Sequence, residues 1–141
     1  MQLSTRNQLD GTVTDVRLGT IMAEVTVDIG GQIVVAEVTR GGVERLGLEP
    51  RDDVTVLIKA TEVMLGKGSA AFENLTIRNQ IPGKVTQVVV GSVMAEVTVA
   101  VADEHVVAAV TRTSVDRLGF SEGEDVVVLV KATDVTLAKS A

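Results

Sequence analysis

The stretch Met22–Val27, with the sequence MAEVTV, recurs unchanged as Met94–Val99, 72 residues further along the chain. Ala and Val alternate in it with Glu and Thr, which is the period of a β-strand with one buried face. Outward from this stretch, residues 6–67 align with residues 78–139 without a gap, and 34 of the 62 pairs are identical. The chain is therefore an internal duplication, and both copies are expected to share one fold.

A short segment rich in small residues joins the two copies. Residues 66–74, GKGSAAFEN, contain Gly, Ser and Ala and lack the alternating apolar pattern. Such a composition is typical of a tether. We therefore divide the chain into a first domain at residues 1–67, a linker at 68–75 and a second domain at 76–141.

Each copy contains short β-branched segments separated by Gly or acidic turns, which predicts strands. In the first copy the predicted strands are residues 12–16, 23–29, 33–38 and 54–58. Residues 41–48 suit one helical turn that ends at Gly47, and residues 113–120 are their counterpart. The pattern predicts an all-β chain of two tandem OB-like Greek-key β-barrels, each with about five strands and one short helical turn.

The composition excludes some classes of function. The chain is 45% apolar and 23% charged, as expected for a globular protein with a core. Phe72 and Phe120 are its only Phe, Tyr or Trp residues, and the net charge is -6. Proteins that bind single-stranded nucleic acid usually stack bases on aromatic rings in a basic groove. We therefore expect no nucleic-acid partner.

The sequence also predicts a location. No cysteine is present, so disulfides, thiolate metal sites and cysteine nucleophiles are excluded. Met1–Gly11 lacks the apolar region of a signal peptide, and no run of about 18 apolar residues could span a bilayer. We expect a cytoplasmic protein without a membrane partner.

Few residues suit catalysis. His105 is the only histidine and aligns with Ile33, so a solvated loop position fits it better than a general base. Glu24 and Glu96 recur in mid-strand without a second acid, which favours a structural or cross-strand pairing role over catalysis. Gly30-Gly31 lacks the spacing of a phosphate loop and suits a hairpin turn. We expect no enzyme, no cofactor and no directly bound metal cation.

Hydrogen-bond donors recur at equivalent places in both copies. They are Ser4-Thr5-Arg6-Asn7, Thr39 and Lys59 in the first copy, and Thr76-Ile77-Arg78-Asn79, Thr111, Ser114 and Lys131 in the second. A small tetrahedral oxyanion needs donors and one or two cations from several directions. The same residues could equally be solvated surface or turn positions, and composition leaves both interpretations open.

Four blocks of the second copy, taken together, resemble a known family. They are Arg-Asn-Gln-x-x-Gly, Val-Met-Ala-Glu-Val, Val-Thr-x-x-Ser-Val-x-x-Leu-Gly and Val-Lys-Ala-Thr-x-Val, and the first copy repeats them with few changes. This pattern resembles the Mop, or TOBE-type, molybdate-binding domain over residues 4–67 and 76–139. The tandem form is similar to the di-Mop proteins called molbindins.

The resemblance implies an OB-like fold and reversible binding of molybdate, with tungstate as a second ligand, for intracellular storage, buffering or homeostasis. It also implies a homotrimer of tandem chains, with oxyanion sites between domains and between subunits. The ligand segments of the family fall on Ser4, Thr5, Arg6, Asn7, Thr39, Gly42, Lys59 and Ala60, and on Thr76, Ile77, Arg78, Asn79, Thr111, Ser114, Lys131 and Ala132.

Two departures from the family pattern predict that the sites differ in affinity. Gly42 occupies a family Ser position in the first copy, and Thr76 occupies another in the second. The turns at Gly41-Gly42 and Thr113-Ser114 are the expected places for sites near a three-fold axis. Other functions remain open at this point: a regulatory or nucleic-acid-binding OB-fold repeat without oxyanion storage, a regulatory part of a transporter ATPase or transcription factor, and a purely structural oligomer.

Overall fold

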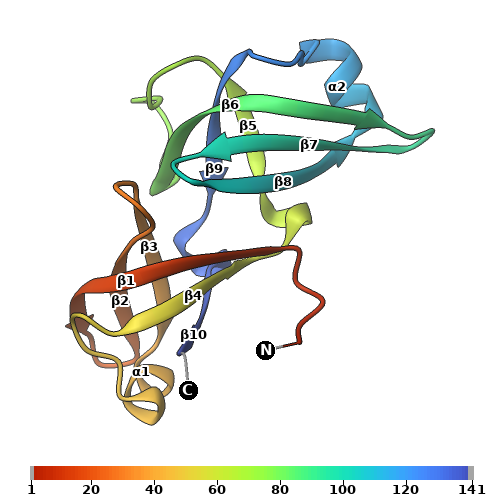
Figure 1. Ribbon diagram of the computed structural model, residues 1–141. Coiled ribbons are helices and arrows are strands. Elements are labelled where there is room, and N and C mark those ends of the chain that lie inside the picture. Colours follow the sequence, from red (N-terminus) through yellow and green to blue (C-terminus); the bar gives the residue numbers. More distant parts are fainter. Residues whose placement is uncertain (1, 140–141) are drawn as a thin grey trace.

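Alternating apolar residues form the strands of both copies in the computed structural model, which describes residues 2–139 (Figure 1). The first copy contains β1 (Asn7–Leu18), β2 (Met22–Asp28), β3 (Ile33–Thr39), α1 (Arg40–Leu46), β4 (Asp53–Ile58), the 3-10 turn η1 (Ala60–Glu62) and β5 (Met64–Lys67). The second contains β6 (Asn79–Val90), β7 (Met94–Val101), β8 (Glu104–Thr111), α2 (Arg112–Leu118), β9 (Asp125–Val130), η2 (Ala132–Asp134) and β10 (Thr136–Lys139).

Each sheet is completed by the last strand of the other copy. β10 pairs antiparallel with β4, which gives the order β10-β4-β1-β2-β3. β5 pairs with β9 in the same way, which gives β5-β9-β6-β7-β8. In Figure 1 the blue β10 accordingly lies beside the yellow β4 of the first copy. β5 thus lies within residues 1–67 of the sequence, but it forms its strand hydrogen bonds with β9 of the second sheet.

The curled sheets have the strand order of an OB-like barrel. β10 pairs with β4 and also contacts β3, the opposite edge of the same sheet, so the sheet bends back on itself. The predicted all-β class with one short helix in each copy is confirmed. The predicted strand at residues 12–16 is only part of β1, which begins at Asn7 and continues past a β-bulge between Val13 and Asp15.

The core is built almost entirely from valine and other aliphatic side chains. Val25, Val27 and Val56 in the first sheet, like Val97 and Val99 in the second, are fully buried. The buried residues of both sheets form one continuous cluster. Since full burial of such a side chain contributes about 1.5–3 kcal/mol, the strand faces supply the main stabilisation of both copies without aromatic residues in the strands.

The exchanged strands also cap the helices, which lie at opposite ends of the molecule (Figure 1). α1 ends at Gly47, which has a left-handed φ of 62°. Lys139 of β10 donates to the carbonyl oxygens of Leu46 and Gly47, each at 3.2 Å. Lys67 of β5 donates to a carbonyl at the end of α2 in the same way, at 2.7 Å. A cation at a helix C-terminus satisfies free carbonyls and the helix dipole, so strand exchange stabilises the helix of the other copy.

Three local predictions can be compared with the structure. Gly30 and Gly31 form the predicted hairpin turn between β2 and β3, with φ values of 87° and 98°. His105 is exposed as expected, but it lies in β8 opposite Ala100, so its predicted loop position is wrong. The tether between the copies is bonded to β6, because the Phe72 N–H donates to the side chain of Gln80 at 2.7 Å. No helix within residues 2–139 has both the length and the apolar character needed to cross a membrane.

Candidate anion-binding site

The Arg-Asn-Gln blocks lie where each copy meets the other. The side chain of Asn79 accepts from the Val35 N–H at 2.7 Å and donates to the Val35 carbonyl at 2.8 Å. Asn7 forms the same pair of bonds with Val107, at 2.8 and 2.9 Å. Asn7 and Asn79 are the buried polar residues of residues 2–139, each 2% exposed. Their side-chain amides therefore join the copies, and the ligand role that the family resemblance implied stays a prediction.

The arginines of the same blocks form ion pairs between the copies. Arg6 donates to both carboxylate oxygens of Glu96, at 2.7 and 3.3 Å. Arg78 donates to Glu24 at 2.8 Å. The hydrogen bond from Arg6, followed by its charge, lowers the pKa of Glu96, and the same contacts raise the pKa of Arg6. The recurring glutamates thus pair with arginines of the other copy, which is a structural role of the kind expected, with a partner outside their own sheet.

The glutamines position the segments that precede the first strand of each copy. Gln8 donates to the carbonyls of Leu3 and Thr5, at 3.2 and 3.0 Å. Gln80 donates to the carbonyl of Ile77 at 3.0 Å. Both glutamines belong to the repeated block, but no pattern in the sequence indicated this role. The bonds fix the shape of the Ser4-Thr5 and Thr76-Ile77 segments beside the arginines.

Five of the predicted second-copy residues meet at one cavity of about 610 Å³, which we call the Arg78 cavity. It is lined by Glu37, Met64, Thr76, Ile77, Arg78, Lys131, Ala132 and Thr133. Lys131 immediately precedes η2, and its ammonium group forms no ion pair with any residue in 2–139. The residues that line this hollow therefore carry a hydroxyl, a guanidinium bonded to Glu24 and an ammonium without an ion pair.

The repeat assigns equivalent positions in the first copy, and we call this set the Arg6 site: Ser4, Thr5, Arg6, Lys59 and Ala60. Lys59 precedes η1 as Lys131 precedes η2. Within the described part of the chain it also forms no ion pair. Arg6 ties this segment to the second copy through Glu96. By the repeat, the Arg6 site has the same cations as the Arg78 cavity.

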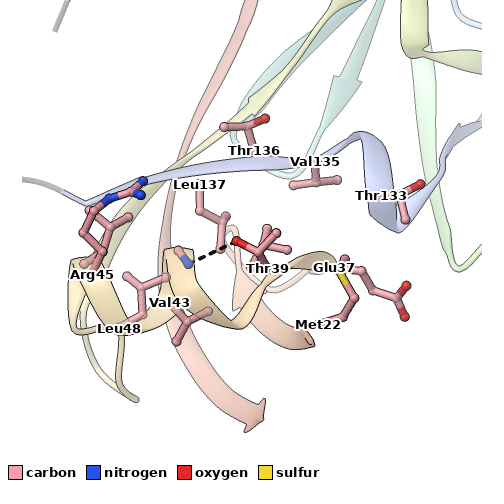
Figure 2. A pocket seen from close by; sticks show the side chains of 13 residues that line it. Met22, Glu37, Thr39, Val43, Arg45, Leu48, Thr133, Val135, Thr136 and Leu137 are labelled. Atoms are coloured by element: carbon pink, nitrogen blue, oxygen red, sulfur yellow. Dashed lines mark hydrogen bonds between the residues drawn. The ribbon is translucent and has the colours of Figure 1, made fainter. Parts of the chain in front are cut away.

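The remaining predicted residues line a second pair of cavities, one beside each helix. Thr39 and Gly42 line a hollow of about 380 Å³ between α1 and the η2–β10 segment (Figure 2). Thr111 and Ser114 line the equivalent hollow of about 430 Å³ beside α2. Aliphatic side chains such as Val135 form much of the first wall. The predicted ligands that line these cavities therefore divide between two kinds of hollow, one at Arg78 and one beside each helix.

The threonines in these helix cavities are partly committed to capping. Thr39 is the N-cap of α1, and its hydroxyl accepts from the Gly42 N–H at 3.1 Å (Figure 2). Thr111 accepts from the Ser114 N–H at 3.1 Å and donates to its hydroxyl at 2.8 Å. The predicted difference between Gly42 and Ser114 is thus a difference of one hydroxyl beside an otherwise similar helix start.

The sequence did not single out Glu37, Met64 and Thr133 as residues near an anion. Glu37 and Thr133 line both the Arg78 cavity and the α1 cavity, so the two hollows adjoin. The repeat could have pointed to two of them, because Glu37 and Met64 are positions where the copies differ: they align with Ala109 and Thr136. No group of three His, Cys, Asp or Glu residues in 2–139 is arranged to hold a metal ion.

Comparison with protein families agrees with the repeat. A family model described as the TOBE domain matches residues 3–65 and again residues 75–137. The chain belongs to the TOBE-domain family. The predicted resemblance is confirmed over nearly all of both copies, and each TOBE repeat contributes four strands to one sheet and its last strand to the other.

Relatives of this TOBE-domain chain are named for molybdenum. It is 35% identical to molybdenum-pterin-binding protein MopA of Rhodobacter capsulatus over 98% of this chain and 52% of MopA. It is 39% identical to molybdenum-pterin-binding protein 1 of Clostridium pasteurianum over 46% of this chain and 97% of that protein. The chain thus spans about half the length of MopA, while one TOBE repeat corresponds to the whole of the clostridial protein.

A solved structure has the same arrangement of both repeats. The cytoplasmic molybdate-binding protein ModG, with molybdate bound, matches with a TM-score of 0.91 and 33% sequence identity. The match covers 98% of this chain and 99% of ModG. The tandem TOBE architecture is therefore shared over the full length of a molybdate-binding protein.

Proposed function

We propose that the protein binds molybdate reversibly, at the Arg78 cavity, the Arg6 site and their surroundings between the repeats. The observation that carries the proposal is the meeting of Thr76, Arg78 and the unpaired Lys131 at one cavity. Its support is the likeness of the whole chain to ModG, a molybdate-binding protein. This likeness favours an oxyanion ligand over the regulatory and nucleic-acid alternatives.

The chemistry of the cavity suits a small dianion. Charge-assisted hydrogen bonds from guanidinium and ammonium groups are stronger than neutral ones, and Thr76 adds a hydroxyl. The chain as a whole carries a net charge of -6, so its overall field repels anions. Local cations must therefore supply the attraction, and salt screens the long-range repulsion within roughly 8–10 Å. Binding selectivity then depends on cavity size and donor geometry, which tungstate satisfies as well as molybdate.

The proposed role is intracellular storage, buffering or homeostasis in the cytoplasm. Molybdate has five heavy atoms, and a ceiling of about 1.5 kcal/mol per atom gives roughly 7.5 kcal/mol, or a dissociation constant of a few micromolar. Such an affinity allows release as well as uptake. The relatives are named as binding proteins, and we propose that this chain likewise holds the ion without transforming it.

We further propose that the chain works as a homotrimer, with additional sites between subunits. The tips of the β1–β2 and β6–β7 hairpins expose aliphatic side chains, and Ile21 and Val93 are 76% and 73% exposed. Leu18, Met22, Val90 and Met94 are exposed beside them. Covering such tips by other copies of the chain would remove apolar surface from water. The trimer itself follows from the family resemblance.

Isothermal titration with sodium molybdate tests the proposal, with sulfate and phosphate as controls and light scattering for the oligomer. Saturable heat with molybdate and tungstate, none with sulfate, and a mass of three chains are expected. Absence of heat together with a melting temperature that molybdate leaves unchanged would overturn the binding proposal, since a ligand that binds the folded state stabilises it. A single-chain mass would overturn the trimer alone.

A further inference from the structure

One carboxylate distinguishes the surroundings of the two proposed sites. Glu37 of β3 lines the Arg78 cavity, and the repeat places Ala109 of β8 at the equivalent position. The surroundings of the two residues match: Glu37 lines a cavity with Thr133 of η2, and Ala109 lines one with Thr61 of η1. A negative charge therefore stands on one side of the pseudosymmetric molecule and a methyl group on the other.

Glu37 is placed to act on an anion in the Arg78 cavity. Figure 2 shows its carboxylate at the Thr133 end of the α1 cavity, pointing away from Thr39 and Val43. The side chain is half-buried. Within residues 2–139 it accepts no hydrogen bond from a side chain and forms no ion pair. Its charge is therefore not neutralised by a neighbouring cation.

The neighbouring strand increases the difference. Glu37 is paired across β2 and β3 with Glu24, the carboxylate that binds Arg78. Ala109 is paired with Glu96, the carboxylate that binds Arg6. The Arg78 cavity thus has two cations and two nearby carboxylates, whereas the Arg6 site has two cations and one.

From this asymmetry we propose that Glu37 determines anion affinity: it weakens dianion binding at the Arg78 cavity, so that the Arg6 site fills first. The inference rests on the proposed function, since it assigns different strengths to the two sites named there. A single charge several ångströms from a dianion at a partly solvated site changes binding on the order of tenfold. One chain then holds its ligand over a wider range of concentration than two equal sites would.

Variants that keep one site at a time test the difference. Lys59→Ala retains the Arg78 cavity and Lys131→Ala retains the Arg6 site, and both are titrated with sodium molybdate by calorimetry. Lys131→Ala is expected to bind about tenfold more tightly than Lys59→Ala. Adding Glu37→Gln to Lys59→Ala removes the charge with little change in shape and should restore about tenfold. Adding Ala109→Glu to Lys131→Ala should weaken binding by a similar factor.

Glu122→Ala in the Lys59→Ala background is the matched control, because it removes one negative charge from an exposed position outside the cavities described above. It should leave the affinity unchanged. Equal affinities of the two single-site variants, or no gain from Glu37→Gln, would overturn the role of Glu37 while molybdate binding by the unmodified protein stands. Absence of molybdate binding by the unmodified protein would overturn both proposals. Thermal melting of each variant checks its fold, and Glu37→Ala provides a second neutral substitution.

Discussion

The two repeats are the same where they hold each other and differ where they face a cavity. Arg, Asn and Gln begin both copies and make equivalent contacts: an ion pair to the other copy, an amide bridge to its edge strand and a bond to the preceding segment. By contrast, two positions where the copies differ lie at cavities. Glu37 in the first copy corresponds to Ala109 in the second, and Gly42 corresponds to Ser114. A duplicated chain can therefore keep one architecture while its two sites diverge.

The amide bridges give the largest expected difference between the copies. Val35 is buried, whereas Val107 is half-buried. Asn79→Ala leaves the Val35 N–H and carbonyl without their partner, and we expect a loss of about 2–5 kcal/mol in the free energy of unfolding. Asn7→Ala should cost about 1–3 kcal/mol, because water can reach part of Val107. Urea unfolding measures both, with the exposed Asn74→Ala as a control. Equal losses for Asn7→Ala and Asn79→Ala would contradict the difference in burial.

These asparagines show what the sequence could and could not predict. The repeat, the alternation of valines and Gly47 were sufficient for two OB-like units with one helix each. The exchange of β5 and β10 could not be predicted from the sequence. Their sequences, MLGK and TLAK, have similar patterns, so each strand could pair with its own copy or with the other. Local propensity is the same in both pairings, so three-dimensional geometry decides between them. The repeated block identified both asparagines as candidate ligands. Their bonds to the other copy could not be predicted, because they depend on burial between the two sheets.

The lysines that cap the helices give a smaller difference. Lys67 bonds a carbonyl at the end of α2 at 2.7 Å and pairs with Glu124 at 3.0 Å. Lys139 makes two bonds of 3.2 Å to α1 and pairs with Asp52 at 3.2 Å. Both lysines are about one third exposed, so solvent screening limits each loss on substitution by Met to about 1 kcal/mol.

The two lysine substitutions should also differ from each other in the stability that they remove. Lys67→Met should cost more than Lys139→Met, because one carboxylate oxygen of Glu124 is already buried without a partner and loss of the cation leaves that group less well compensated. Urea unfolding of both variants measures the order. Lys84→Met is the control, since Lys84 pairs with an exposed Asp125 outside the helix ends. A greater loss for Lys139→Met would show that capping of α1 outweighs the buried carboxylate.

The ion pairs between the copies provide the smallest expected effect, which depends on pH. Arg6 holds the pKa of Glu96 below its ordinary value of 4.5. A carboxylate with a lowered pKa in the folded state contributes stability above its unfolded pKa, and this contribution is lost as the pH falls through the folded value. Glu96→Gln should therefore lower stability at pH 7 slightly and flatten the decline below about pH 4.5. Acid unfolding followed by circular dichroism measures the slope.

Arg6→Met should reproduce the change, and the double variant should add nothing further, because both substitutions remove the same bond. Additive effects of the two substitutions would mean that Glu96 and Arg6 act through separate partners and that the bidentate pair does not cause the pKa shift.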